Sequence, residues 1–334
     1  MKRIIIIFTI LLLIFIGIYR SKLVNKIGYT KMNWMKYDTI IELTLYYNKD
    51  SSFIYSDFYK IIDKKLDSLN MLFSSYDTSS LIYKINHSND TIFVIPKPLA
   101  YVIRQSLVFS QLSEGLFDIT VKPLIKLWDF RKGIIPEQSE IDKIKNIVGY
   151  KNLILKNDTL ILKKRGIQID LGAISKGFII DSITNFITEQ KFTIAGIFNI
   201  GGDLKTFGHK IGKDSLWHIG LEHPRNKNKI WKELLIGNNT AVTTSGDYER
   251  FFIKNGIRYS HIINPITCTP VQSNIVSATV IAKNSTIADG LSTTILLLGN
   301  PQKVSQFMKK NFPEVKYIII LEKNNQLVEF SNNE

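Results

Sequence analysis

The stretch Ile169-Asp-Leu-Gly-Ala-Ile-Ser-Lys-Gly177 joins two kinds of secondary structure and organises the chain around it. We expect a strand to end at Asp170, the backbone to turn at Gly172 and a helix to cover residues 173–190. A helix N-terminus attracts phosphate through its free N–H groups, and Lys176 adds a positive charge one turn in. The stretch is not a Walker A motif, and an ordinary strand-to-helix turn remains the alternative.

On both sides of this stretch, strand and helix patterns alternate without a regular βαβ rhythm. Period-two and β-branched segments predict strands at 38–47, 153–156, 159–163, 194–200, 216–221, 250–254, 275–282 and 315–321. Apolar residues at helical spacing predict further helices at 56–72, 96–113, 137–148, 286–298 and 301–311. Asn157-Asp158 fits a hairpin turn. We therefore predict an α+β fold, with mixed or antiparallel sheets flanked by helices.

The N-terminus carries a membrane signal. Lys2 and Arg3 precede an apolar run of 16 residues, Ile4 to Tyr19, just short of the roughly 17 that a spanning helix needs. Gly17-Ile18-Tyr19 is a poor cleavage site, and a buried core helix seldom begins a chain in this way. An uncleaved signal anchor is therefore favoured over a cleaved signal peptide.

This interpretation divides the chain into three parts. Residues 1–20 form the anchor, residues 21–35 a linker, and residues 36–334 the functional domain.

Composition excludes several classes of site. The single cysteine, Cys268, rules out an intrachain disulfide framework and any Cys-rich zinc or iron–sulfur site, and five histidines make a His-cluster metal site unexpected. The net charge of +14 fits nucleic acid, anionic lipid, a phosphate-bearing ligand or a solvated basic surface. Since no long Lys/Arg block and no aromatic-basic motif is visible, we expect no nucleic-acid partner.

Three further blocks carry residues suited to chemistry. Gly115-Leu-Phe-Asp-Ile-Thr-Val-Lys-Pro-Leu124 places an acid and a hydroxyl two residues apart, and Asn199-Ile-Gly-Gly-Asp203 permits close backbone approach to a ligand. His261, between Ser260 and an Asn-Pro turn, is a candidate general base because its ordinary pKa lies near neutrality. Each block also has a purely structural interpretation, as a loop, a tight turn or a structural histidine.

Asp289 and Thr293 lie four residues apart in a predicted helix, so they share one face. A carboxylate and a hydroxyl suit a hard cation such as Mg2+, although two side chains do not complete its shell. Backbone carbonyls, water and substrate phosphate would supply the rest. A helix cap by Asp289 is the alternative.

Taken in order, these blocks resemble the ApbE family, the FAD:protein FMN transferases, over residues 36–321. The resemblance rests on the blocks quoted above, together with Thr244-Ser-Gly-Asp-Tyr248, Phe73-Ser-Ser-Tyr-Asp-Thr-Ser-Ser80 and Ala288-Asp-Gly-Leu-Ser-Thr293. It implies an ApbE-like, T-fold-related architecture. It also implies cleavage of FAD and transfer of FMN to a Thr or Ser of a target protein, with release of AMP. Family members usually work on the outer face of the bacterial cytoplasmic membrane, which fits the predicted anchor.

The resemblance also assigns residues. Asp289, Thr293 and the carbonyl of Ala173 would bind the metal, and His261 would be the base near the acceptor hydroxyl. The positions that match the family's FAD contacts are Met32, Tyr76, Leu116, Phe117, Asp118, Asp170, Lys176 and Ile263.

The chain departs from the family pattern at three positions. Asn264 stands where the family usually has Asp, Gly290 where Ala is common, and Cys268 where the turn usually has Gly. If that turn requires positive φ, Cys268 is strained. Two other activities stay open: an FAD pyrophosphatase that releases FMN and AMP, and a membrane-tethered flavin-binding protein without turnover.

Overall fold

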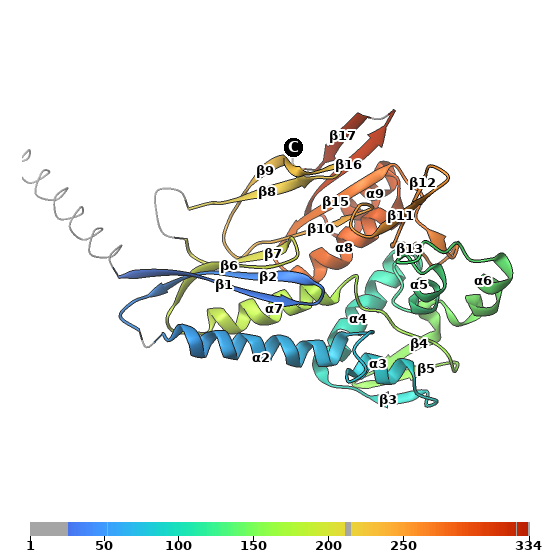
Figure 1. Ribbon diagram of the computed structural model, residues 1–334, viewed down its shortest axis with the longest axis horizontal. Coiled ribbons are helices and arrows are strands. Elements are labelled where there is room, and N and C mark those ends of the chain that lie inside the picture. The colour runs from blue at the N-terminus through green and yellow to red at the C-terminus, as the bar shows by residue number, and fades with distance from the viewer. Residues whose placement is uncertain (1–25, 52, 211–214, 325, 333–334) are drawn as a thin grey trace, which may run out of the picture.

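A computed structural model describes residues 26–51, 53–210, 215–324 and 326–332, and an eight-stranded sheet lies at its centre (Figure 1). All neighbouring strands in this sheet pair antiparallel, in the order β1-β2-β6-β7-β10-β15-β16-β17. The strands are β1 (Ile27–Lys36), β2 (Thr39–Asn48), β6 (Thr193–Ile200), β7 (Asp203–Gly208), β10 (Ala241–Gly246), β15 (Ile275–Ala282), β16 (Lys316–Lys323) and β17 (Gln326–Ser331).

Helices cover one face of the sheet and a hairpin covers part of the other. The helices are α2 (Tyr55–Phe73), α4 (Lys97–Leu112), α7 (Ser175–Thr188), α8 (Ser285–Leu298) and α9 (Pro301–Asn311). The hairpin joins β8 (Trp217–His223) and β9 (Asn226–Ile236). In β2, Ile41, Leu43 and Leu45 are buried in the main core, while Tyr46 packs beside Trp217 of the hairpin. Alternation along the strand thus supplies both layers.

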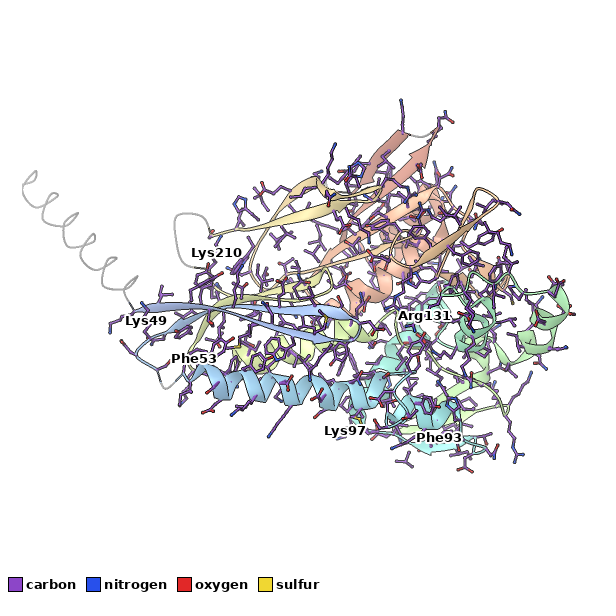
Figure 2. The ribbon with its side chains drawn as sticks, viewed as in Figure 1. Lys49, Phe53, Phe93, Lys97, Arg131 and Lys210 are labelled. Atoms are coloured by element: carbon purple, nitrogen blue, oxygen red, sulfur yellow. The ribbon has the colours of Figure 1, made fainter. Side chains whose placement is uncertain are left out.

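Helix α2 shows how the helical layer is held. Its buried residues recur every three or four positions: Phe58, Ile62, Leu66, Leu69 and Phe73. Burying each such side chain contributes about 1.5–3 kcal/mol. At the start of α2, Phe53 (Figure 2) lies with its ring centroid 4.3 Å from that of Tyr47 and 4.9 Å from that of Phe192. These contacts tie the helix to the ends of β2 and β6.

Short elements surround this framework. Three strands form a small separate sheet in the order β3-β5-β4, from β3 (Ile92–Val94), β4 (Leu153–Lys156) and β5 (Thr159–Leu162). The short helices are α3 (Leu81–Asn86), α5 (Lys122–Trp128) and α6 (Gln138–Ile144). Two hairpins follow β10: β11 (Phe251–Lys254) with β12 (Ile257–Ser260), and β13 (Ile263–Asn264) with β14 (Thr269–Pro270).

The α+β prediction with antiparallel sheets flanked by helices is confirmed, and most of the predicted elements are present. The linker prediction for 21–35 is wrong from Ile27 onward, because that segment pairs along its whole length with β2 as an edge strand. The helix predicted at 137–148 ends at Ile144 and continues only as a 3₁₀ turn over Lys145–Ile147.

The predicted anchor, residues 1–20, lies outside the described residues. None of the helices in the described part of the chain has the length and apolarity needed to cross a bilayer.

Candidate active site

Helices α7 and α8 are locked together by two buried carboxylates. Asp289 of α8 accepts a hydrogen bond of 2.8 Å from the backbone N–H of Gly177 in the first turn of α7. In return, Asp181 of α7 accepts the backbone N–H groups of Ser285 (3.0 Å) and Thr286 (2.8 Å) in the first turn of α8. Each carboxylate therefore satisfies free donors at the positive end of the other helix. The exchange fixes the position of Asp289 relative to α7.

The lock also requires close packing of the two helices. A Cβ on Gly177 would lie 2.2 Å from the carbonyl oxygen of Ser285, so only glycine fits there. Lys205 of β7 neutralises Asp181 through an ion pair of 2.6 Å in which both side chains are largely buried. The stretch from Ile169 to Gly177 thus places Gly177 where α7 and α8 cross.

The Thr293 hydroxyl and the Ala173 carbonyl lie near Asp289 at the crossing of α7 and α8. Thr293, one turn after Asp289, places its hydroxyl 3.1 Å from that of Ser245 at the end of β10. Because the Gly177 N–H is taken by Asp289, it does not bond the Ala173 carbonyl four residues earlier. That carbonyl accepts no hydrogen bond from the described residues. Carboxylate, hydroxyl and carbonyl oxygens are the ligands that Mg2+ takes, so these residues fit such a cation.

No group of three or more His, Cys, Asp or Glu side chains is placed to hold a metal within the described residues. A cation at this crossing would depend on Asp289, the Thr293 hydroxyl, the Ala173 carbonyl and oxygens from outside the chain. This is the incomplete shell that the sequence indicated.

Lys176 forms an ion pair with Asp203, the acid of the Gly-Gly-Asp segment. The other oxygen of Asp203 accepts the backbone N–H of Thr244 at 2.9 Å, which fixes the carboxylate between β7 and β10. Burial would lower the pKa of Lys176, but the charges of Asp203 and Asp289 outweigh burial and raise that pKa. Burial raises the pKa of Asp289 to about 7 against the opposing effect of Lys176. A cation at this place would hold Asp289 ionised.

The Gly-Gly turn beside Asp203 leaves its backbone accessible. Gly201 and Gly202 have φ of 57° and 98°. Nothing lies within 4 Å of where a Cβ on Gly202 would stand. The backbone can therefore approach a ligand closely here, as the sequence predicts.

A second group of predicted residues meets around Asp170. Its Oδ2 accepts the hydroxyl of Ser75 (2.7 Å) and the ammonium of Lys122 (3.2 Å), and its Oδ1 accepts the N–H of Gly172 (3.0 Å). The Lys122 ammonium also lies 3.3 Å from the ring centroid of Tyr76, whose side chain is 65% exposed. A buried cation thus supports an exposed aromatic ring that is free to stack on a planar ligand.

The block containing Asp118 forms the wall of a hollow of about 270 Å³ shared with Pro265 and Ile266. Asp118 is buried and accepts hydrogen bonds from Thr120 and from the backbone N–H of Tyr150. Burial raises its pKa, and these hydrogen bonds oppose that shift. Asp118 therefore shapes this hollow by anchoring the loop at residues 149–152.

The other residues of these blocks play packing roles. Phe117 is buried against Phe109, and Leu116 packs half-buried on the main core. Ile263 lies in a small cluster with Trp128 and Cys268.

His261 follows strand β12, and the charges of both Lys176 and Asp170 act on it. Its backbone N–H donates to the Arg250 carbonyl at 2.8 Å, and its Nδ1 lies 3.1 Å from the same oxygen. Because a carbonyl only accepts, Nδ1 carries the proton and Nε2 is left as the acceptor. Burial, helped by the charges of Arg250 and Lys176, lowers the pKa of His261 to about 4, although the hydrogen bond to the Arg250 carbonyl and the charge of Asp170 oppose this shift. The ring is therefore neutral at pH 7.

Met32 does not join the site. It is 0% exposed in the middle of β1, opposite Leu43, and belongs to the main hydrophobic core. The predicted flavin contact at Met32 is wrong, because this side chain points to the face of the sheet that the helices cover.

The sequence did not assign a role to four residues that the structure brings to the site: Asp203, Lys122, Ser245 and Asp181. Asp203, Lys122 and Ser245 lie within the sequence motifs that resemble the family. Each is a polar residue directly beside a glycine or a proline, and this position could have marked it as a site residue.

Comparisons with known proteins identify the family. The profile of the ApbE family matches residues 37–319. A FAD:protein FMN transferase of Vibrio cholerae is 32% identical over 248 residues, which cover 71% of this chain and 72% of the relative. One of Haemophilus influenzae is 31% identical over 271 residues, covering 78% of this chain and 77% of that relative.

Solved structures show the same fold. The flavin transferase ApbE from Vibrio cholerae superimposes with a TM-score of 0.82 at 24% identity, covering 92% of this chain and 98% of its own. The ApbE protein of Thermotoga maritima has a TM-score of 0.78 at 29% identity, covering 90% and 96%.

Proposed function

The chain belongs to the ApbE family, and we propose that it transfers FMN from FAD to a Thr or Ser hydroxyl of a target protein, releasing AMP. The observation that carries this proposal is the oxygen cluster of Asp289, Thr293 and Ala173, in a chain that also brings the charge of Lys176 to bear on both Asp289 and a neutral His261. Attack on a phosphoanhydride needs neutralisation of phosphate charge and a positioned nucleophile rather than covalent chemistry by the protein.

Asp289, Thr293 and the Ala173 carbonyl would hold Mg2+. When bound, this cation would neutralise charge on the FAD pyrophosphate oxygens. Lys176 contributes a second positive charge, and Asp203 holds its ammonium in place. The exposed ring of Tyr76 offers a face for the isoalloxazine, and the hollow at Asp118 is open to another part of the ligand.

His261 supplies the base. Its Nε2 takes the proton of the acceptor hydroxyl as the oxygen attacks the phosphorus of the FMN half. The bond from that phosphorus to the bridging anhydride oxygen breaks, so AMP leaves and FMN remains attached to the acceptor through a phosphoester. The hydrogen bond from Nδ1 to the Arg250 carbonyl orients the ring for this transfer.

The membrane location rests on the sequence alone. The basic start and apolar run of residues 2–19 favour an anchor in the cytoplasmic membrane, with the transferase domain on the extracytoplasmic side. Fractionation of cells that produce the full chain, followed by protease treatment of spheroplasts, tests this part. Signal in the soluble cytoplasmic fraction would contradict it.

The transferase proposal is tested with residues 21–334, FAD, Mg2+ and a flavin-acceptor domain, by intact mass spectrometry of the acceptor. We expect a mass gain of one FMN that requires Mg2+ and disappears when the acceptor hydroxyl is removed. Free FMN and AMP without a mass gain would instead indicate the pyrophosphatase. FAD that stays bound and intact would indicate a flavin-binding protein.

A further inference from the structure

A second hollow, of about 360 Å³, lies directly behind His261. Ser260 and Ile262, the two chain neighbours of His261, both line it. Its lining comes mainly from β12 and the turn before it, the residue after β10, the start of β15 with the segment before it, and the end of β16. Only the backbone of residues 260–262 therefore separates a ligand in this hollow from the His261 side chain. The FAD-side residues described above, including Lys176 and Asp289, do not line it.

The two acids in this hollow are already satisfied. Arg225 donates to both oxygens of Asp247, at 2.7 and 2.9 Å, and to Glu322 at 3.0 and 2.7 Å. A bidentate pair of this kind is strong and directional. Asp247 and Glu322 therefore have little capacity left to neutralise another cation.

Arg258, the second arginine in this hollow, makes no hydrogen bond to either acid. Its Nη1 is buried in the wall and has no hydrogen-bond partner among the described residues. Its Nε lies 3.9 Å from Asp247, too far for a hydrogen bond, and its guanidinium stacks 3.8 Å above the ring of Phe251. A buried donor without an acceptor is costly, so the site is complete only when an acceptor atom enters it. A carboxylate matches the charge of the guanidinium.

Exposed apolar side chains stand beside Arg258 on the hairpin. Phe251 and Ile253, on the same face of the hairpin as Arg258, are 38% and 59% exposed, and Ile257, which lines the hollow at the turn, is also exposed. Lys176, the cation that the proposed function assigns to FAD, does not line this hollow, so the FAD phosphates do not account for Arg258. Exposed apolar side chains beside a guanidinium with an unpaired nitrogen fit a protein segment better than a nucleotide.

Building on the proposed function, we propose that this hollow binds the acceptor protein, with an acidic side chain of the acceptor paired to Arg258 and apolar residues on Phe251 and Ile253. An extended chain spans about 3.3 Å per residue, so this acid stands only a few residues from the hydroxyl that His261 deprotonates. Arg258 thus selects the acceptor, and it takes no part in FAD cleavage.

The test measures FMN transfer to a soluble acceptor domain that the wild-type enzyme modifies, using Arg258→Met and Arg258→Lys. We expect Arg258→Met to raise the KM for the acceptor by about tenfold or more, the loss of one charged hydrogen bond. The KM for FAD and the release of AMP without acceptor should change less than twofold. Arg258→Lys should recover part of the affinity because it keeps the charge. Arg104→Met, a matching change at an exposed arginine of α4, should leave all values unchanged.

The matching acid is found by replacing, one at a time, the Asp and Glu residues near the modified hydroxyl of the acceptor. One replacement should raise the KM for wild-type enzyme and leave the KM of Arg258→Met unchanged. An unchanged acceptor KM in Arg258→Met, additive effects for every acceptor acid, or an equal rise in the KM for FAD would overturn the proposal. Failure of the proposed function itself is distinct, because the wild-type enzyme would then transfer no FMN to any acceptor.

Discussion

The α7–α8 crossing and the β11–β14 hairpins, the two halves of the proposed site, are built differently. In α8, eleven of the residues are buried, among them Asp289, and three backbone N–H groups bonded to two carboxylates fix the crossing. The hairpins lie outside the eight-stranded sheet, and Phe251, Ile253 and Ile257 are exposed on them. The half that would hold the cation is therefore rigid, while the half that carries His261 stands at the surface, where an acceptor can reach it.

The departures from the family pattern follow the same division. Asn264 and Cys268 lie in the hairpin half, and Cys268 has a φ of 60°, so the predicted strain is present. Gly290 lies in the helical half, where a Cβ would meet the ring of Phe109 at 2.4 Å. Glycine at 290 is thus required by packing in this chain. Two of the three departures thus lie in the hairpin half, and the one in the helical half is matched by the packing of Phe109.

Removing Asp289 should break the rigid half completely. We expect Asp289→Ala to lower Mg2+-dependent transfer by more than roughly 100-fold, since it removes the one carboxylate of the cluster and leaves the Gly177 N–H unpaired. Initial rates across a Mg2+ series measure this. Asp57→Ala, at an exposed aspartate of α2, should have wild-type activity. Undiminished activity in Asp289→Ala would end the metal assignment.

Replacing His261 should distinguish the role of the hairpin half in FMN transfer from the role of the helical half in binding. We expect His261→Ala to slow transfer by about 100-fold or more while the Kd for FAD changes only slightly, because general bases contribute about 10²–10⁴ to rate. Single-turnover transfer and FAD titration by fluorescence give the two values. Equal losses in both would mean that His261 binds ligand or holds structure instead.

Weakening the lock from the other helix should loosen the cation half without touching a ligand. We expect Asp181→Asn to raise the Mg2+ concentration for half-maximal activity by about 10- to 100-fold, because α8 loses its charged cap and Lys205 its partner. Thermal melts should show lower stability. A melt that falls while the Mg2+ requirement stays unchanged would show that Asp181 serves stability alone.

The protonation of His261 sharpens the comparison further. Its pKa of about 4 lies below the ordinary 6.5, so the folded protein binds this proton more weakly than the unfolded chain. Its contribution to stability is complete above about pH 6.5 and is lost as the pH falls from 6.5 toward 4. Denaturant melts of wild type and His261→Gln across this range, with NMR titration of the ring, measure it. A ring that titrates near 6.5 would show that the site does not disfavour the imidazolium.

The smallest effect concerns the strained turn in the hairpin half. A left-handed backbone costs a residue with a side chain about 1–2 kcal/mol. We expect Cys268→Gly to leave the free energy of unfolding nearly unchanged, because relief of strain offsets the loss of a buried thiol. Cys268→Val should lower it by more than about 1 kcal/mol, since a β-branched residue is least suited to this φ. Chemical denaturation of the three proteins decides, and equal stabilities would argue against strain at this position.

Sequence patterns predicted the helices well but missed several strands, among them β7 and β10 in the middle of the sheet and β1 at its edge. Helix α8 and strand β15 were found because their periodicity and caps are local properties, visible in a short window. Strand β1 was missed because it carries charged and polar residues on its exposed side and lies at a sheet edge, where pairing with β2 decides its structure. The short β13–β14 hairpin depends in the same way on its surroundings.

The site shows the same limit. Asp289 and Thr293 were found because helical spacing places them on one face. The partners of Asp289 and Lys176, namely the Gly177 N–H and Asp203, come from other elements, and no local pattern reveals that those elements meet. Met32 was misplaced because its face of β1 depends on the strand register.

The most direct measurement is a crystal structure of residues 21–334 with FAD and Mn2+ in place of Mg2+, recorded at a wavelength where Mn2+ scatters anomalously. We predict one anomalous peak in contact with a carboxylate oxygen of Asp289, the Thr293 hydroxyl and the Ala173 carbonyl, with the FAD pyrophosphate on its far side facing His261. A peak elsewhere, or FAD bound with no cation at the α7–α8 crossing, would contradict the assignment of the site.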